Sequence, residues 1–262
     1  MACIMRIQLI RGATLRFSYA GRNFIIDPCF SAKHTMPSWA GKSLNPLVDL
    51  GCSPLEVIEG IEMAIISHLH SDHFDSVARK LLPKEMLVFC QPSDEPGIRN
   101  KGFYNVTPIE NEISWNGITI TRFPGQHGTG EVLKEMGNVS GFVFQAEAEP
   151  TIYWTGDTIW CNVVKDVIKR TQPKIIVTHS CGAVWRNSTP IVMDATQTID
   201  LCHSAPKSTV IATHMDSFDH ATVSREFLRE YANANCCCSQ VLSLPCPRHL
   251  PKPAHIFCRI TA

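Results

Sequence analysis

The 262-residue sequence contains no uninterrupted apolar run near the roughly 18 residues needed to cross a bilayer, which argues against membrane insertion. It also has no excess of charge, because 24 basic side chains balance 24 acidic ones and the formal net charge is +0. A dedicated nucleic-acid binder needs a basic excess for its phosphate contacts, so we expect no nucleic-acid partner. Intrinsic disorder is excluded as well, since hydrophobic residues make up 44% of the chain and charged residues 18%.

The start of the chain lacks the order of charged, apolar and small-residue regions that marks a signal peptide. Its short apolar patch is interrupted by Arg6 and Arg11. We therefore expect a cytoplasmic protein. The 12 cysteines include no two Cys-x-x-Cys pairs at zinc-finger spacing. In a chain of this length we expect the isolated cysteines to be small buried hydrophobes rather than disulfides.

Short strands dominate the first half of the chain, and strands alternate with helices in the second half. Residues 13–19 alternate polar and apolar side chains, and a turn then leads into an apolar run at 24–28, which predicts a hairpin. Further strands are expected at residues 62–66, 86–90, 118–123, 141–145, 151–154, 174–178 and 208–213, and helices at residues 54–59, 77–82, 159–170, 194–204 and 222–231. Two β-rich layers covered by helices would account for both halves.

No internal repeat and no linker divides the chain before its last segment, so residues 1–235 are interpreted as one domain. Both periodicities are lost over residues 236–262. Three adjacent cysteines at 236–238 are followed there by prolines at 245, 247, 251 and 253 among scattered basic residues. We expect this segment to be an irregular Cys/Pro-rich tail, loosely packed or non-native.

The apolar run at residues 62–66 is followed directly by the sequence SHLHSDH, residues 67–73. Four potential metal ligands within six residues cannot share one face of a helix or strand, whereas on a loop they can turn toward two neighbouring points. His68 and His70 would face one ion, and Asp72 and His73 would face a second. Imidazole and carboxylate groups suit zinc, iron or manganese. The alternative is a polar surface turn that happens to be rich in histidine.

Three other predicted strands end in a side chain of the same chemistry. His127 follows the strand at 118–123, Asp157 follows 151–154, and His214 follows 208–213. Each of these alone can be an ordinary loop residue. Together they place a potential ligand wherever a buried strand meets its loop, and they complete two coordination sets.

The motif His-x-His-x-Asp-His resembles that of the metallo-β-lactamase fold superfamily, and the likeness covers most of residues 6–231. It implies a mixed α/β (α+β) chain folded as a four-layer αββα sandwich. The resemblance also implies two sets of metal ligands: His68, His70 and His127 for the first ion, Asp72, His73 and His214 for the second, and Asp157 bridging both. The segments SHLHSDHFD, IIDPCFS and THMDSFDH are most similar to the branch that contains L-ascorbate-6-phosphate lactonase.

The same resemblance implies a metal-dependent hydrolase with a dinuclear centre, zinc before manganese or iron. A bridging hydroxide would attack a small ester, lactone or phosphoester, and Asp72 would be both a ligand and a proton shuttle for the leaving group. Asp27, in the IIDPCFS segment, is expected to brace the metal loop as a hydrogen-bond acceptor, or else simply to end its strand. The expected partner is a small-molecule substrate, and a homo-oligomer is compatible with the resembled branch.

Other residues near the motif have two interpretations each. His220 is predicted to be catalytic, by contacting the substrate or acting as a general acid, and its alternative is a structural histidine. His179 either lines the pocket or is structural. Arg186 either anchors a phosphate or carboxylate or is a surface arginine. Three tryptophans are expected at the pocket rim: Trp39, Trp160 and Trp185.

Two other functions stay open, a phosphodiesterase acting on a nucleotide or lipid headgroup and a non-catalytic metal-binding protein of the same fold. Loss of a ligand would favour the second, and all seven are present. The sequence FPGQHGTG at residues 123–130 departs from the TPGHTPGS-type segment of glyoxalase-like members, which disfavours thioester hydrolysis. A redox-active di-iron member would need a flavin-binding partner domain.

Overall fold

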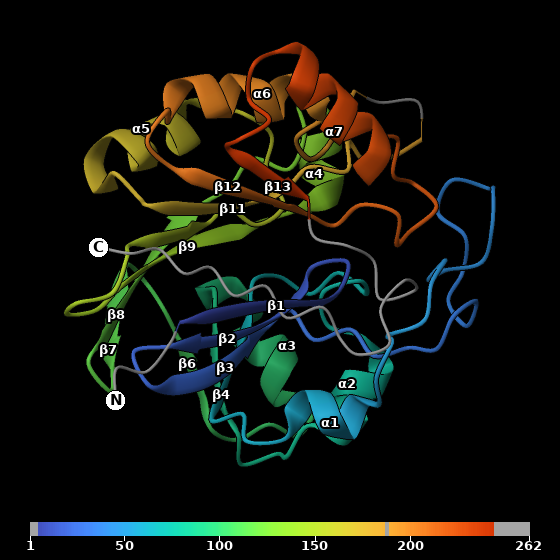
Figure 1. Ribbon diagram of the computed structural model, residues 1–262. Coiled ribbons are helices and arrows are strands. Elements are labelled where there is room, and N and C mark those ends of the chain that lie inside the picture. The colour runs from blue at the N-terminus through green and yellow to red at the C-terminus, as the bar shows by residue number, and fades with distance from the viewer. Residues whose placement is uncertain (1–4, 187–188, 244–262) are drawn as a thin grey trace.

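Residues 5–186 and 189–243 are described by the computed structural model. Two β-sheets lie face to face, and helices cover the outer face of each sheet (Figure 1). The expected four-layer αββα sandwich is therefore confirmed. Within the described residues, no helix is long and apolar enough to cross a membrane.

The first sheet is built from the first half of the chain. Its six strands follow one another in sequence order: β1 (Arg6–Arg11), β2 (Thr14–Tyr19), β3 (Arg22–Ile26), β4 (Met63–Ile66), β5 (Leu87–Cys90) and β6 (Val106–Pro108). The strands β1 to β3 are antiparallel, and β3 to β6 are parallel. Its outer face is covered by α1 (Pro54–Ile58), α2 (Ser76–Leu81) and α3 (Glu95–Arg99), the last preceded by a 3₁₀ turn at Pro92–Asp94.

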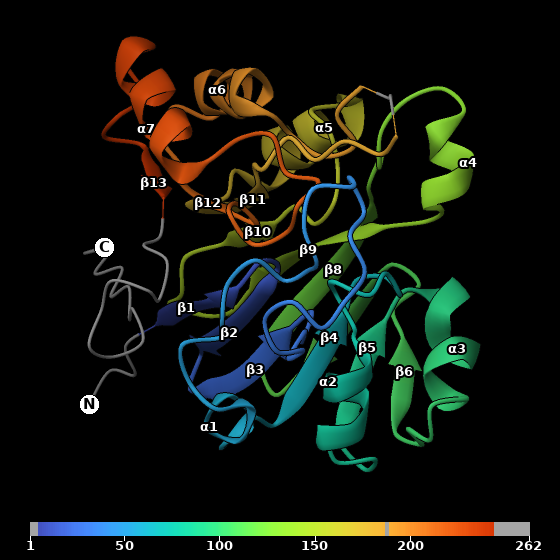
Figure 2. The same cartoon turned by 90° about the vertical axis from the view of Figure 1, so that its right-hand side faces the viewer.

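The second sheet has seven strands, and its parallel part comes from the second half of the chain. In spatial order they are β13 (Val241–Ser243), β12 (Thr209–Thr213), β11 (Ile175–His179), β10 (Ile152–Trp154), β9 (Ser140–Gln145), β8 (Ile118–Pro124) and β7 (Glu112–Trp115). The strands β7 to β10 are antiparallel, and β10 to β13 are parallel. Figure 2 shows α5 (Asn162–Thr171), α6 (Ala195–Ser204) and α7 (Arg225–Ala234) over this sheet, and α4 (Val132–Met136) beside them.

Both faces of the central strands are buried, which explains their continuous apolar runs. In β3, Phe24 and Ile26 join the core between the two sheets, whereas Ile25 packs in the core under the first group of helices. The same alternation holds in β4, where Ile65 faces the other sheet and Ile66 faces the helices. A strand with period-two alternation and two apolar faces belongs to a layered α/β structure covered on both sides.

Parallel strands determine where the polar loop residues gather. The carboxyl ends of β3 and β4 lie at one edge of the first sheet, and those of β10, β11 and β12 lie at one edge of the second. In open α/β sheets ligands bind outside the carboxyl ends of the strands. The loops after β4, β10 and β12 leave from these ends. The loop after β8, which carries His127, leaves from the same edge because β8 runs in the direction of β10.

Two helices start later than the sequence pattern predicts, because an extended residue precedes each of them. The helix expected from residue 159 begins at Asn162, since Cys161 has φ −133° and ψ 174°. The helix expected from residue 222 begins at Arg225, since Ser224 is extended and its hydroxyl caps the helix by accepting from the Phe227 amide.

The start of the predicted tail packs against the second sheet. Cys237 is buried in the core beneath α6 and α7, and β13 pairs with β12 in parallel. The remainder of the predicted tail, residues 244–262, lies outside the described residues.

Candidate metal centre

The side chains of the seven predicted ligands extend from four separate loops and converge at one place. The segment after β4 provides the motif at residues 68–73, and the loops after β8, β10 and β12 provide His127, Asp157 and His214. All are buried except His70, which is half-buried. The structure therefore brings together every residue of the predicted set, and their role as ligands stays a prediction.

The first group consists of three histidines. One ring nitrogen from each of His68, His70 and His127 lies within 4.8 Å of the other two. The rings of His68 and His70 are 4.4 Å apart and nearly perpendicular, so their nitrogens can converge without the rings stacking. This is the set that the resemblance assigns to the first ion.

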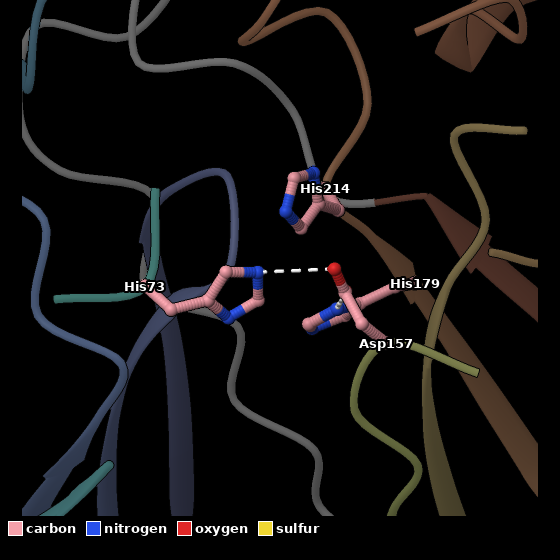
Figure 3. Close-up of side chains that lie close together, drawn as sticks. All are labelled: His73, Asp157, His179 and His214. Atoms are coloured by element: carbon pink, nitrogen blue, oxygen red, sulfur yellow. Dashed lines mark hydrogen bonds and ion pairs between the residues drawn. The ribbon is translucent and has the colours of Figure 1, made fainter. Parts of the chain in front are cut away.

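The second group joins His73 and His214 to two carboxylates. The Oδ2 atom of Asp72 lies 3.4 Å from Nε2 of His214 and 3.7 Å from Nε2 of His73. His73, His214 and Asp157 also belong to a cluster whose ligand atoms lie within 4.8 Å of one another, together with His179 (Figure 3). The sequence does not assign His179 to either set.

Asp157 stands between the two groups. Its Oδ2 atom lies 3.2 Å from Nε2 of His73 and 3.4 Å from Nε2 of His127. The same oxygen lies 4.0 Å from Nε2 of His68. One carboxylate oxygen therefore faces imidazoles of both groups, as a bridging ligand must.

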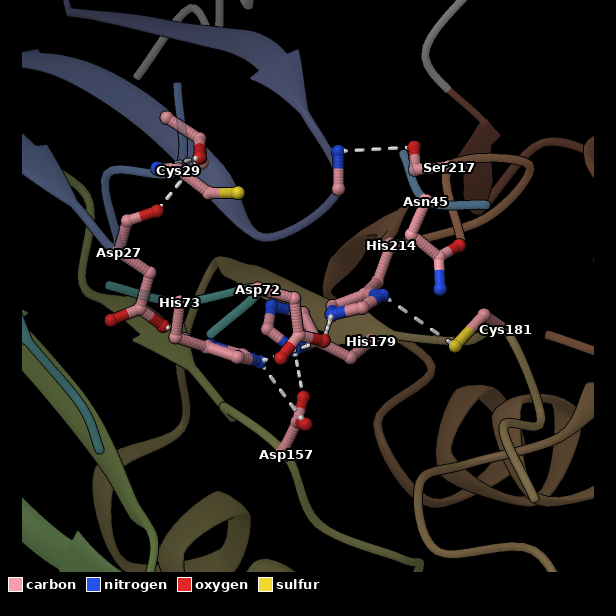
Figure 4. Close-up of polar contacts among 12 residues, drawn as sticks. Asp27, Cys29, Asn45, Asp72, His73, Asp157, His179, Cys181, His214 and Ser217 are labelled. Carbon is pink, nitrogen blue, oxygen red and sulfur yellow. Dashed lines mark hydrogen bonds and ion pairs between the residues drawn. The ribbon is translucent and has the colours of Figure 1, made fainter. Parts of the chain in front are cut away.

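The Nδ1 atoms of His68, His73 and His127 are each held by a hydrogen bond on the side away from the cluster, and Figure 4 shows Asp27 beside His73. Nδ1 of His73 donates to Oδ2 of Asp27 at 2.6 Å, and Nδ1 of His127 donates to the carbonyl of Ile191 at 2.8 Å. The hydroxyl of Ser67 donates to Asp27, so its oxygen accepts from Nδ1 of His68. A proton on Nδ1 leaves an unshared electron pair on Nε2, which is the tautomer that a metal ligand needs.

The Nε2 atoms of His68, His73 and His214 are buried and make no hydrogen bond with any described residue. A buried polar atom without a partner is costly, and such atoms are rare in folded proteins. Several of them aimed at the same small space, beside two carboxylates, fit divalent cations as their partners. The donor set therefore fits the metals that the sequence predicts.

The electrostatics of the site also favour cations. Burial alone would lower the pKa of His73, but the carboxylates of Asp157, Asp72 and Asp27 outweigh it and raise the pKa to about 10. These three carboxylates stabilise a positive charge at this place. Burial and the neighbouring His73 hold the pKa of His68 well below its ordinary value, which keeps this imidazole neutral.

A cavity of about 220 Å³ opens over the two groups. Its walls include the ring of His220 and four apolar side chains, those of Trp39, Met136, Trp185 and Ile191. Larger hollows of about 580 and 780 Å³ lie elsewhere but contain none of the predicted ligands, so size alone does not identify the site.

The remaining predicted pocket residues divide into three that reach the cavity and three that do not. Trp39, Trp185 and His220 line it. Trp160 instead packs at the edge of the core under α5 and lies under the ammonium group of Lys165. Arg186 is a surface arginine whose side chain is 71% exposed and pairs with Glu135. His179 is fully buried and donates to Asp157.

Two buried carboxylates near the site have no signal in the sequence. Asp75 caps α2 and accepts hydrogen bonds from Phe30 and Ser31, so it ties the motif segment to the loop after β3. Asp219 accepts from the loop that carries Trp39, including the Ser38 hydroxyl and the Trp39 amide. Each joins residues far apart in the chain, which is why pattern analysis does not find them.

Comparison with known proteins agrees with this geometry. A family profile described as a beta-lactamase superfamily domain matches residues 22–215. The UPF0173 protein YddR of Bacillus subtilis is 34% identical over 244 residues, which cover 91% of this chain and 96% of that protein.

Two solved structures are similar over nearly the whole chain. A possible metal-dependent hydrolase from Veillonella parvula superposes with a TM-score of 0.90 at 29% identity, covering 97% of this chain and 100% of the other. An isothiocyanate hydrolase from Delia radicum gut bacteria superposes with a TM-score of 0.87 at 32% identity, covering 93% and 97%. The finer resemblance to the lactonase branch stays a prediction. The chain therefore belongs to the beta-lactamase superfamily, and it is a metal-dependent hydrolase with the metallo-β-lactamase fold.

Proposed function

We propose that the two groups of ligands hold two divalent ions, zinc before manganese or iron, and that the protein hydrolyses a small uncharged substrate. His68, His70 and His127 would hold the first ion, and Asp72, His73 and His214 the second. The placement of Asp157 Oδ2 between the groups supports its role as the bridge. Histidine and carboxylate ligands suit zinc, although manganese and iron accept the same set.

Two such ions, when bound, polarise the electrophilic group of a substrate and lower the pKa of a shared water to about 7. The protein's own side chains would hold the substrate and move protons. Asp72 borders the cavity, so its carboxylate can take the proton that the attacking water loses and pass it to the leaving group. His220 also borders the cavity, and burial lowers its pKa to about 4. Its neutral ring would offer one hydrogen-bond donor and one acceptor to the reacting group.

The side chains that line the cavity are the basis for the proposed class of substrate. They combine two indole rings with Met136 and Ile191, and among the described residues no lysine or arginine lines the cavity. The two proposed ions would bind the reacting group, but an anionic substituent elsewhere on the substrate would meet no cationic side chain of the described residues and would lie near the carboxylate of Glu135. Small esters and lactones with a neutral, apolar substituent are therefore favoured, and a phosphodiester, whose charge the ions would bind, stays the alternative.

A second candidate substrate is an isothiocyanate, R–N=C=S. It is favoured by the 32% identity to the isothiocyanate hydrolase, together with the small, mainly apolar cavity. Water would add to the central carbon to give a thiocarbamic acid, which separates into an amine and carbonyl sulfide. The atoms balance as R–N=C=S + H₂O → R–NH₂ + COS. The leaving nitrogen takes up a proton, which the same acid–base groups can supply.

Metal content tests the dinuclear centre. Elemental analysis of the purified protein should give about two ions per chain, and Asp157→Ala should lose a large part of them because this residue would contact both. The exposed carboxylate of Asp166 provides the matched control, since Asp166→Ala removes a charge on α5 that belongs to none of the ligand clusters. Wild-type protein that retains hardly any metal after supplementation would overturn the proposal.

Activity on a panel of probes separates the candidate substrates. Short aryl esters and γ-lactones report on acyl hydrolysis, benzyl isothiocyanate on amine release, and a bis-aryl phosphate on phosphodiester hydrolysis. We expect turnover of neutral probes and little of the phosphate. The opposite order would contradict the argument from the cavity walls.

The cytosol is the compartment that we propose, with a small molecule as partner. The described residues contain nine free cysteines, and a reducing compartment keeps thiols in that form. Association into a homo-oligomer stays a prediction from the resemblance.

A further inference from the structure

The two oxygens of Asp157 have different environments (Figure 3). Oδ2 faces imidazoles of both ligand groups, at 3.2 Å from His73 and 3.4 Å from His127. Oδ1 points the other way and accepts a hydrogen bond of 2.5 Å from Nδ1 of His179. Because a carboxylate can only accept, the proton lies on Nδ1 of His179.

The ring of His179 is held in place by its surroundings. His179 is the last residue of β11, is fully buried, and its backbone is in register with Thr213 of β12. Its ring meets the indole of Trp154 nearly at right angles, with the ring centres 5.1 Å apart. The donor that reaches Asp157 therefore comes from the interior of the sheet rather than from a loop.

An aspartate carboxylate without hydrogen bonds need not bridge two ions through one oxygen atom. The terminal torsion of an aspartate is broad and roughly two-fold, so both oxygens can turn toward the same ion and chelate it. Committing one oxygen to a hydrogen bond removes that alternative and leaves a single atom for the space between the two groups. Hydrogen-bond partners of metal ligands set ligand orientation in this way.

We propose that His179 is a positioning residue for Asp157: by binding Oδ1 it leaves Oδ2 alone to reach both metal positions. This inference rests on the proposed dinuclear site. It adds a residue to which the metal-binding motif assigns no role.

The same cluster of side chains also allows the alternative that His179 is itself a metal ligand. Its Nε2 atom is buried without a hydrogen-bond partner among the described residues, and the ring belongs to the cluster with His73, Asp157 and His214. If Nε2 were itself a metal ligand, the ring would act through that nitrogen and not through Nδ1. The two readings depend on different atoms of one side chain.

Three substitutions separate these atoms. The amide nitrogen of asparagine reaches about as far from the backbone as Nδ1 of histidine, whereas the amide group of glutamine reaches the place of Nε2. His179→Asn therefore keeps the donor to Asp157, His179→Gln keeps only the distal polar atom, and His179→Leu keeps neither. Thr178→Val is the control, since it removes a buried hydroxyl from the preceding residue of the same strand.

The experiment measures zinc stoichiometry by elemental analysis and zinc affinity by competition with a chromogenic chelator, with thermal unfolding as the check on folding. We expect His179→Asn and Thr178→Val to match wild type, and His179→Gln and His179→Leu to bind zinc roughly 10–100-fold more weakly. The visible spectrum of the cobalt-substituted protein adds a signature that a purely structural role would not move. Its intensity should fall in the Gln and Leu variants, because a chelating Asp157 raises the coordination number.

The result that overturns the proposal is retention of zinc by His179→Gln together with loss by His179→Asn, which would make Nε2 the ligand. Wild-type affinity in both Gln and Leu would show that Asp157 needs no support, and equal loss in Asn and Gln would show that the whole ring is required. Both outcomes also refute it. If His179→Leu fails to fold, the Asn and Gln pair decides. A wild type with one ion instead of two would refute the dinuclear site, while the same pair would still test the orientation of Asp157.

Discussion

Asp27 is the residue whose replacement tests the supporting network most directly. Its side chain is fully buried and accepts three hydrogen bonds: from the Ser67 amide at 2.8 Å, the Ser67 hydroxyl at 2.7 Å and Nδ1 of His73 at 2.6 Å. Asp27→Asn keeps the shape but exchanges one acceptor oxygen for a donor. If the remaining side-chain oxygen of this variant accepts from His73 and the Ser67 hydroxyl, its new NH₂ group faces the backbone N–H of Ser67. Two donors then meet, and the backbone N–H of Ser67 is left buried and unpaired.

The magnitude follows from that single mismatch. An unsatisfied buried donor costs about 1–3 kcal/mol of unfolding free energy. Each kcal/mol lowers the melting temperature by roughly 2–4 °C in a chain of this size. Loss of a partner behind a metal ligand weakens metal binding roughly 10–100-fold, which is about 1.4–2.8 kcal/mol.

The assay combines thermal unfolding of the chelator-treated protein with a zinc competition titration. Asp49→Asn is the matched control, because Asp49 is exposed and distant in sequence from the motif. We expect both stability and zinc affinity to fall for Asp27→Asn and neither to fall for the control. Wild-type zinc affinity in a folded Asp27→Asn would refute the idea that this carboxylate orients His73.

Three further substitutions probe the pocket, the bridging loop and the loop over the site. Trp39→Ala removes a cavity wall, so KM for probes with a large apolar substituent should rise roughly tenfold or more while kcat for the smallest probe changes little, as steady-state kinetics across a substituent series will show. Gly156→Ala places a side chain at a φ of 68° and against the carbonyl of Ser140, so we expect about 1–3 kcal/mol of strain and a lower metal content by elemental analysis. For Asp219, burial would raise the pKa, but hydrogen bonds led by the Ser38 hydroxyl hold it well below the ordinary value. Its contribution to stability is therefore present above about pH 4 and lost as the pH falls below it, so melting curves in chelator should show Asp219→Asn less stable than wild type at pH 7 and the two converging in acid.

The gathering of the seven candidate ligands at one place could be predicted from the sequence because their positions follow a local rule. A strand is visible as an apolar or alternating run, and the first residues after it lie at the edge of the sheet. His214 directly follows β12, and His127 and Asp157 lie three residues beyond β8 and β10; the structure brings all three to the motif at residues 68–73. The same rule could have found His179, since it ends the apolar run of β11. Its role could not be read from that position, because the role depends on a contact with Asp157 in the loop after β10.

The elements that the sequence pattern misses are short or depend on their neighbours. The strand β1 ends in Arg11, a buried arginine that donates to the carbonyls of Cys29 and Val48. Because arginine is usually exposed, this buried position could not be recognised from the sequence. The helices α3 and α4 have five residues each, which is too short for a helical period to be visible. Their existence is a consequence of packing rather than of local propensity.

The substrate is harder to infer than the metal because the cavity walls have no common local signal. Trp39 comes from the loop after β3, Met136 from α4, and Trp185 from the segment after β11. The position of Trp39 depends on Asp219, whose carboxylate accepts from Ser38 across 181 positions of sequence, and on Phe218, whose ring stacks on the indole with the centres 5.1 Å apart. A change in any one of these loops would alter the cavity and leave the seven candidate ligands in place. Chains with the same seven residues can therefore differ in substrate, because residue type determines which metals bind, whereas the folded loops determine the shape of the cavity.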